Sequence, residues 1–108
     1  MLISDSGKVV VVTVVSDQCL TLWRTCEPYL ALGRRAFVLD LSQVEFLNSV
    51  NVAAILIARN RLSVGGSELL IAGLTPRLLE VFRALRLERL FDVSLTREAA
   101  LQLFAGKL

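Results

Sequence analysis

Four consecutive residues, Asn48, Ser49, Val50 and Asn51, carry the side chains that are best placed to bind a protein partner or an anion. They stand between an apolar strand-like segment and an apolar helix-like segment, so they would form a helix start, where backbone N–H groups lack intrahelical acceptors. Ser49 is a candidate phosphorylation site or, alternatively, a helix-capping hydroxyl. The two asparagines could equally be turn and cap residues. Val50 could be an exposed contact residue or part of the core.

The chain lacks the residue sets that catalysis or metal binding would require. It contains no histidine, which excludes Ser–His–Asp and Cys–His catalysis within its 108 residues. Two cysteines without an imidazole make a zinc site implausible. Asp40 and Glu45 are not a credible acid–base pair, because no other reactive group gathers near them. We therefore expect a protein that is not an enzyme, with no catalytic residue, cofactor or metal.

Three other reactive side chains are interpreted as structural. Asp40 ends a buried strand, where an unpaired carboxylate would be costly, so we expect it to bond to loop amides. Cys19 and Cys26 are seven residues apart. On a helix they would share a face about 10 Å apart along the axis, too far for a disulfide. We expect both to be reduced thiols in the core.

Basic residues gather on or just after the third predicted helix and could bind an acidic surface or phosphate. The alternative is a solvated helix face that glutamates partly neutralise. The net charge of the chain is only +2, which gives no indication of nucleic-acid binding. The candidate patch consists of Arg77, Arg83, Arg86 and Arg89.

Apolar runs rich in β-branched residues predict strands, and apolar residues at helical spacing predict helices between them. The expected strands are residues 8–15, 37–41 and 68–72, with a short one at 91–95. Pro28 should end the first helix near residue 26 and leave a kink or separate turn up to residue 32. The other helices should follow Asn51, Thr75-Pro76 and Thr96.

This alternation predicts an α/β fold with a mixed, mostly parallel sheet of about four to five strands and about four flanking helices. An antiparallel strand at the N-terminus is an open alternative. A length of 108 residues indicates a single domain spanning residues 1–108. The longest apolar runs are too short to cross a bilayer, and the N-terminus has no secretory pattern. We expect a cytoplasmic protein without direct membrane insertion; a homodimer is left open.

The middle of the chain resembles the STAS domain of anti-sigma factor antagonists and of sulfate transporter tails. The resemblance covers roughly residues 9–103 and is most specific in the middle third. An apolar strand leads through an Asp-Leu-x-x-Val-x-Phe-Leu segment and a polar turn to an apolar helix, a Gly-Gly pair and another strand. The residues that carry it are 40–47, Gly66 to Ala72, Thr75-Pro76 and 85–91.

The turn departs from the signature of that family, which is Asp-Ser-Ser-Gly or Asp-Ser-Thr-Gly. In the antagonists, the third residue is the hydroxyl that a partner kinase phosphorylates. Here the four positions are Asn48, Ser49, Val50 and Asn51, so the resemblance places valine, which has no oxygen to modify, at the phosphoacceptor position. Arg86 also replaces the family's usual glycine before Leu87.

The resemblance implies a non-enzymatic domain that docks to a kinase-like anti-sigma factor through Asn48, Ser49, Val50 and Asn51, without phosphorylation at position 50. One alternative is an accessory STAS subunit that binds the ATPase of a phospholipid-trafficking ABC transporter. Another is a small-ligand sensor that holds a nucleotide or anion at the helix start.

Overall fold

The computed structural model describes residues 1–15, 19–91 and 96–107. Four strands form one sheet in which spatial order follows chain order. The first pair is antiparallel, and the other two pairs are parallel. The strands are β1 (Leu2–Asp5), β2 (Val9–Thr13), β3 (Ala36–Asp40) and β4 (Glu68–Ala72).

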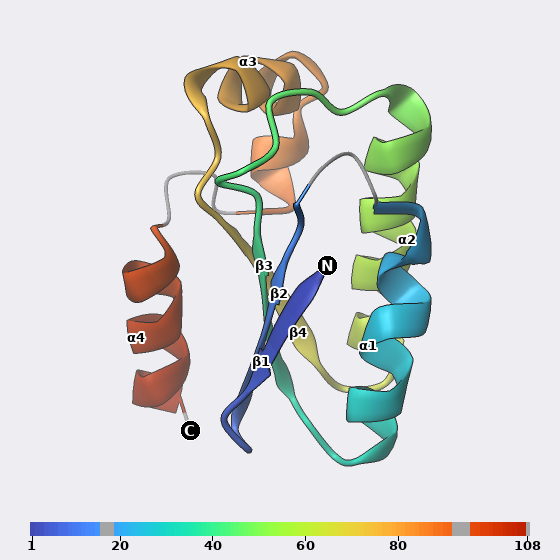
Figure 1. The fold of residues 1–108 in the computed structure, drawn as a ribbon, viewed down its shortest axis with the longest axis vertical. Coiled ribbons are helices and arrows are strands. Elements are labelled where there is room, and N and C mark those ends of the chain that lie inside the picture. Colours follow the sequence, from blue (N-terminus) through green and yellow to red (C-terminus); the bar gives the residue numbers. More distant parts are fainter. Residues whose placement is uncertain (16–18, 92–95, 108) are drawn as a thin grey trace.

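Helices cover both faces of this sheet (Figure 1). Two of them, α1 and α2, lie side by side against one face, α4 covers the opposite face, and α3 lies at one end. The helices are α1 (Leu22–Ala31), α2 (Ser49–Val64), α3 (Pro76–Ala84) and α4 (Arg97–Lys107). Short 3-10 turns at Cys19–Thr21 and Leu87–Arg89 precede α1 and follow α3. The predicted α/β class is confirmed.

Strand prediction succeeded where both faces of a strand are buried. All residues of β2 and β3 are buried, which is why they read as continuous apolar runs. The antiparallel N-terminal alternative is the one observed, since β1 pairs with β2. Every residue of β1 is exposed, so no burial pattern marks it. Most of the strand predicted at 91–95 falls on residues 92–95, outside the described residues.

The predicted break at Pro28 is wrong, because α1 continues through it to Ala31. A proline cannot donate to the carbonyl four residues earlier, which here belongs to Arg24. Both residues lie on the exposed side of α1, where water can satisfy that carbonyl. The predicted stop at Gly33 is confirmed: its φ is +88°, and its N–H donates to the Leu30 carbonyl.

The core has two parts, one on each face of the sheet. The larger lies between the sheet and helices α1, α2 and α3 and includes Phe37, Leu39, Ile55 and Phe82. The smaller lies under α4, where Phe104 and a neighbouring alanine pack on the other side of β2 and β3. Sheet and helices together therefore present the carboxyl ends of β3 and β4 at the end of the molecule near α3 (Figure 1).

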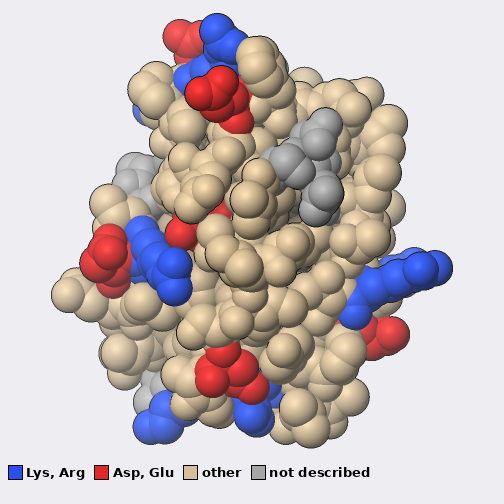
Figure 2. Space-filling model, in the orientation of Figure 1, with Lys and Arg blue, Asp and Glu red and all other residues tan. Residues whose placement is uncertain are grey.

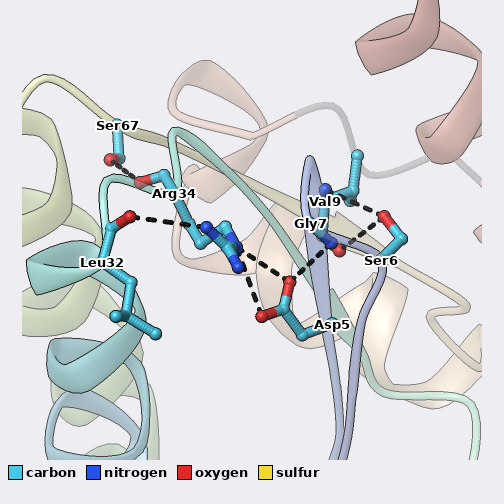
Figure 3. Close-up of polar contacts among 7 residues, drawn as sticks. All are labelled: Asp5, Ser6, Gly7, Val9, Leu32, Arg34 and Ser67. Carbon is cyan, nitrogen blue, oxygen red and sulfur yellow. Dashed lines mark hydrogen bonds and ion pairs between the residues drawn. The ribbon is translucent and has the colours of Figure 1, made fainter.

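An exposed ion pair ties the β1–β2 hairpin to the end of α1 (Figure 3). Arg34 Nε donates to Asp5 Oδ1 at 2.9 Å, and the Gly7 N–H donates to the same oxygen at 2.9 Å. The hydrogen bond from Arg34 lowers the pKa of Asp5, and the one from Gly7 adds to this effect. Ser67 Oγ donates to the Arg34 carbonyl, which links the start of β4 to the same point.

Both cysteines are free and buried, as expected. Burial raises the pKa of the Cys26 thiol from its ordinary 9.0 to about 12. The unfolded chain therefore loses this proton at lower pH than the folded protein. The protonated thiol therefore contributes its full share to the free energy of unfolding below pH 9. This contribution should fall as pH rises from 9 towards 12, by about 1 kcal/mol per pH unit. Urea unfolding of the wild type and Cys26→Ala at pH 8 to 10.5 measures this; equal pH slopes would contradict it.

Candidate functional site

The segment between β3 and α2 is folded by its own polar contacts. Asp40, at the end of β3, is 5% exposed, and its Oδ1 accepts the Ser42 N–H at 2.9 Å. This confirms the loop-bonding role predicted for Asp40. Arg97 Nη1 of α4 lies 3.6 Å from the other carboxylate oxygen, Oδ2. The carboxylate thus fixes the start of the loop and the start of α4 together.

Apolar residues in this loop alternate between core and solvent. The Val44 side chain is 2% exposed and belongs to the larger core. Two residues later, the Phe46 ring is 63% exposed. Leu47 is partly buried against the core again. The loop is therefore anchored on both sides of Phe46, which presents its ring at the surface.

Asn48 caps α2, which confirms the cap role considered for the asparagines and shows that the capping role considered for Ser49 is wrong. Asn48 Oδ1 accepts the backbone N–H of Asn51 at 2.8 Å and Asn51 Nδ2 at 2.9 Å. Ser49 is the first residue of α2, and its side chain is exposed. An amide accepts at the cap position as well as a hydroxyl does, and Asn48 has the extended backbone that a cap requires.

Asn51 lies inside the molecule and not on the surface of the turn. Its side chain is 3% exposed, and its Oδ1 accepts the Cys19 N–H at 3.2 Å. Asn51 thus links the start of α2 to the turn before α1. Of the four predicted partner-binding residues, Asn48, Ser49 and Val50 are exposed, and Asn51 holds them in place from below.

Replacing Asn51 with leucine should test this positioning role. The Asn51→Leu variant loses the acceptor for the Cys19 N–H and the donor to Asn48, so we expect a loss of about 2 kcal/mol in unfolding free energy. Asn60→Leu is the matched control, because Asn60 is exposed on the same helix and its bond to Arg59 is a surface contact. Urea unfolding measures both variants. A similar, small effect of the two would argue against the role.

Val50 is 57% exposed, so it is a surface residue and not part of the core. It does not stand alone: α2 shows apolar side chains along its outer side, at the spacing of one helix face. Ile57, seven residues on, is 48% exposed, and Val64 is 91% exposed. The expected amphipathic helix therefore has apolar residues on both its buried and its exposed side.

Phe46 contacts Arg77, one of the predicted basic residues. The Arg77 guanidinium carbon lies 4.7 Å from the centre of the Phe46 ring. A hollow of about 320 Å³ beside this pair is lined by Glu45, Thr75, Pro76 and Arg77. The start of α3 and the loop before α2 are therefore neighbours. The sequence indicated no pairing between them, and the exposure of Phe46 was not predicted.

The four arginines of the predicted basic patch do not lie at one place on α3. Arg83, Arg86 and Arg89 are exposed at and beyond the end of α3, whereas Arg77 lies at its start. Figure 2 shows acidic and basic atoms side by side over α3 at the top of the molecule. Arg86 adopts φ +58°, the left-handed conformation that a glycine would take most readily. A separate basic binding patch stays a prediction.

The chemistry available here is that of contact and hydrogen bonding. The described residues contain no group of three or more His, Cys, Asp or Glu that could hold a metal ion. Within 1–15, 19–91 and 96–107, no helix has the length and apolar character needed to cross a membrane. The site is an uncharged helix start, with an exposed valine, bordered by an aromatic ring and a cation.

The comparisons with known proteins agree with this fold. A family model described as "Mlab, STAS domain" matches residues 4–97. BtrV of Bordetella bronchiseptica, whose name assigns it to the anti-sigma factor antagonists, is 32% identical over 76 residues. That match covers 70% of this chain and 66% of the relative, so the chain spans about two thirds of the length of that protein.

Two solved structures show the same arrangement of elements. Protein TM1081 of Thermotoga maritima superposes with a TM-score of 0.80 at 17% identity, covering 96% of this chain and 93% of that one. The STAS domain of a SulP transporter from Vibrio cholerae gives a TM-score of 0.77 at 16% identity, covering 94% and 84%. At these identities the two structures support the fold alone.

Proposed function

Because the chain belongs to the STAS domain family, we propose that it works as a non-enzymatic docking protein in the cytoplasm, and that its partner is an anti-sigma factor with a kinase-like ATPase fold. The likeness to BtrV, an anti-sigma factor antagonist by name, supports this partner class. The observation that carries the proposal is the exposure of Val50 at the start of α2.

The docking surface proposed here consists of the loop at residues 42–48, the turn at residues 48–50 and the outer side of α2. Asn48 and Ser49 offer polar contacts, while Val50 and Ile57 offer apolar ones. The buried Asn51 supports this surface from inside through its bonds to Asn48 and Cys19. An ordered turn reduces the entropy that binding would otherwise cost.

Val50 should also make docking independent of phosphorylation at this position. A phosphate on a side chain here would bring a charge of about −1.5 to −2 into the interface and oppose docking. Valine has no oxygen to accept it, so the protein would compete for its partner constitutively or through its abundance. Ser49, exposed one residue earlier, is the remaining hydroxyl of the turn.

Intact-mass analysis after incubation with a kinase-like anti-sigma factor and ATP tests both parts of the proposal. We expect the wild type to bind and gain no phosphate, and Val50→Ser to gain one phosphate and then lose affinity. Ser49→Ala is the control for the position of the phosphate: it lacks the remaining hydroxyl of the turn, and its mass should match the unmodified protein after the same incubation. Stoichiometric phosphate on Ser49 of the wild type would contradict the constitutive mechanism. Absence of binding would contradict the proposed class of partner.

A second candidate is an accessory subunit that binds the ATPase of a phospholipid-trafficking ABC transporter. The apolar outer side of α2, which runs from Val50 to Val64, favours it, because a partner helix could pack along its whole length. Affinity purification from the native organism separates the two: an ABC ATPase recovered with the protein favours this candidate, and a sigma-regulatory ATPase favours the first.

A further inference from the structure

We propose that Phe46 and Arg77 together receive a carboxylate of the docking partner, an inference that rests on the proposed function. The two residues come from different elements, the loop before α2 and the first turn of α3. The guanidinium carbon of Arg77 lies over the Phe46 ring, 4.7 Å from the ring centre. Both side chains are exposed, so the pair is accessible to a partner.

The guanidinium of Arg77 has no acidic partner among the described residues. Two ion pairs occur within that part of the chain, Arg34 with Asp5 and Arg97 with Asp40. The Phe46 ring lies on one side of the guanidinium, and because Arg77 is exposed, its N–H groups remain accessible to a partner. A planar guanidinium can donate to both oxygens of a carboxylate at once. A lysine ammonium lacks this geometry.

The surroundings favour a single carboxylate over a more highly charged group. Glu45 lines the same hollow as Arg77 and would repel a phosphate or a nucleic acid more strongly than a side-chain carboxylate. The Phe46 ring covers one side of the cation, and an anion bound beside an apolar ring is screened less by water. The occupant inferred is therefore an Asp or Glu side chain of the partner with apolar neighbours.

This pair is continuous with the docking surface. The loop that carries Phe46 leads directly into Asn48, Ser49 and Val50, none of which is charged. Figure 1 shows that the same loop crosses the end of the molecule between α3 and α2. Arg77 is thus a cation at the border of the uncharged helix start, where electrostatics chiefly determine partner choice and association rate.

Calorimetric titration of a purified kinase-like anti-sigma factor at low and high salt tests the inference. We expect Arg77→Gln to raise the Kd about tenfold at low salt and to weaken its salt dependence, since one charge pair is lost. Arg77→Lys should fall between Arg77→Gln and the wild type. Arg24→Gln is the matched control, because Arg24 is exposed on α1, outside the proposed docking surface, and should change the Kd less than about twofold.

The Phe46→Leu/Arg77→Gln double variant adds a test of coupling. If the ring acts through the guanidinium, the effects of the two single variants are not independent. The Kd of the double variant should then rise by a smaller factor than the product of the factors measured for Phe46→Leu and Arg77→Gln. Equal Kd values for Arg77→Gln and Arg24→Gln, with wild-type salt dependence, would overturn this inference while leaving docking intact. Failure of the wild type to bind would overturn docking and this inference together.

Discussion

Val50→Asp is expected to abolish docking while leaving the protein folded. Position 50 is the second residue of α2 and is 57% exposed, so the new carboxylate meets solvent in the free protein. A negative charge in the first turn of a helix is favourable, by about 0.3–1 kcal/mol. In the complex the same carboxylate would be buried without a partner, and an unpaired buried charge weakens binding by about 100-fold or more.

The two effects have opposite signs, which separates this result from misfolding. Urea unfolding should show a stability equal to or slightly above that of the wild type, and titration with the anti-sigma factor should show the loss of affinity. Ala53→Asp is the matched control: residue 53 is exposed, one turn further along α2, and should cost less if the turn is the centre of the interface. Tight binding by Val50→Asp would refute the docking surface.

The sequence predicted elements well where one physical signal dominated. Continuous apolar runs identified β2, β3 and β4, because these strands are largely buried. Capping chemistry placed the helix starts, since Thr75 Oγ1 accepts the Leu78 N–H and Thr96 Oγ1 accepts the Ala99 N–H. Pro28 misled the prediction, because local propensity cannot show that α1 has an exposed side at this point.

The site was predicted less completely, for reasons of three-dimensional contact. A resemblance pointed to residues 48–51, but burial of the polar Asn51 depends on the turn before α1, which lies 32 residues earlier. Phe46 looks like a core residue in the sequence, and only the packing of Val44 and Leu47 turns its ring outward. Sequence spacing within one segment carries no information about such contacts between segments.

Arg86 illustrates how a departure from a family pattern can leave the backbone unchanged. The resemblance predicts glycine before Leu87, and the structure shows that this position has φ +58°. Arginine therefore adopts a conformation that costs a non-glycine residue about 1–2 kcal/mol. The buried Leu87 that follows, together with Phe91, supports this strained residue by anchoring the turn in the core.

Gly73→Ala should produce the largest loss of stability, because Gly73 lies against Asp40 and Ser42 at the start of the loop at residues 42–48. Its φ is +75°, and an added Cβ would lie 2.9 Å from Asp40 Oδ1 and 3.1 Å from the Ser42 backbone nitrogen. Neither neighbour can move freely, since the two are bonded to each other. Conformational strain and overpacking together should cost about 3 kcal/mol.

Gly7→Ala separates the two causes of that loss. Gly7 has a similar φ of +89°, but an added Cβ there meets nothing within 4 Å. The control should therefore lose about 1 kcal/mol from backbone strain alone. Urea unfolding of both variants gives the contribution of the close contact by difference. If Gly73→Ala were no less stable than Gly7→Ala, the bond between Asp40 and Ser42 would not constrain the loop. The surface formed by Phe46 and Val50 would then lack the rigid base on which docking depends.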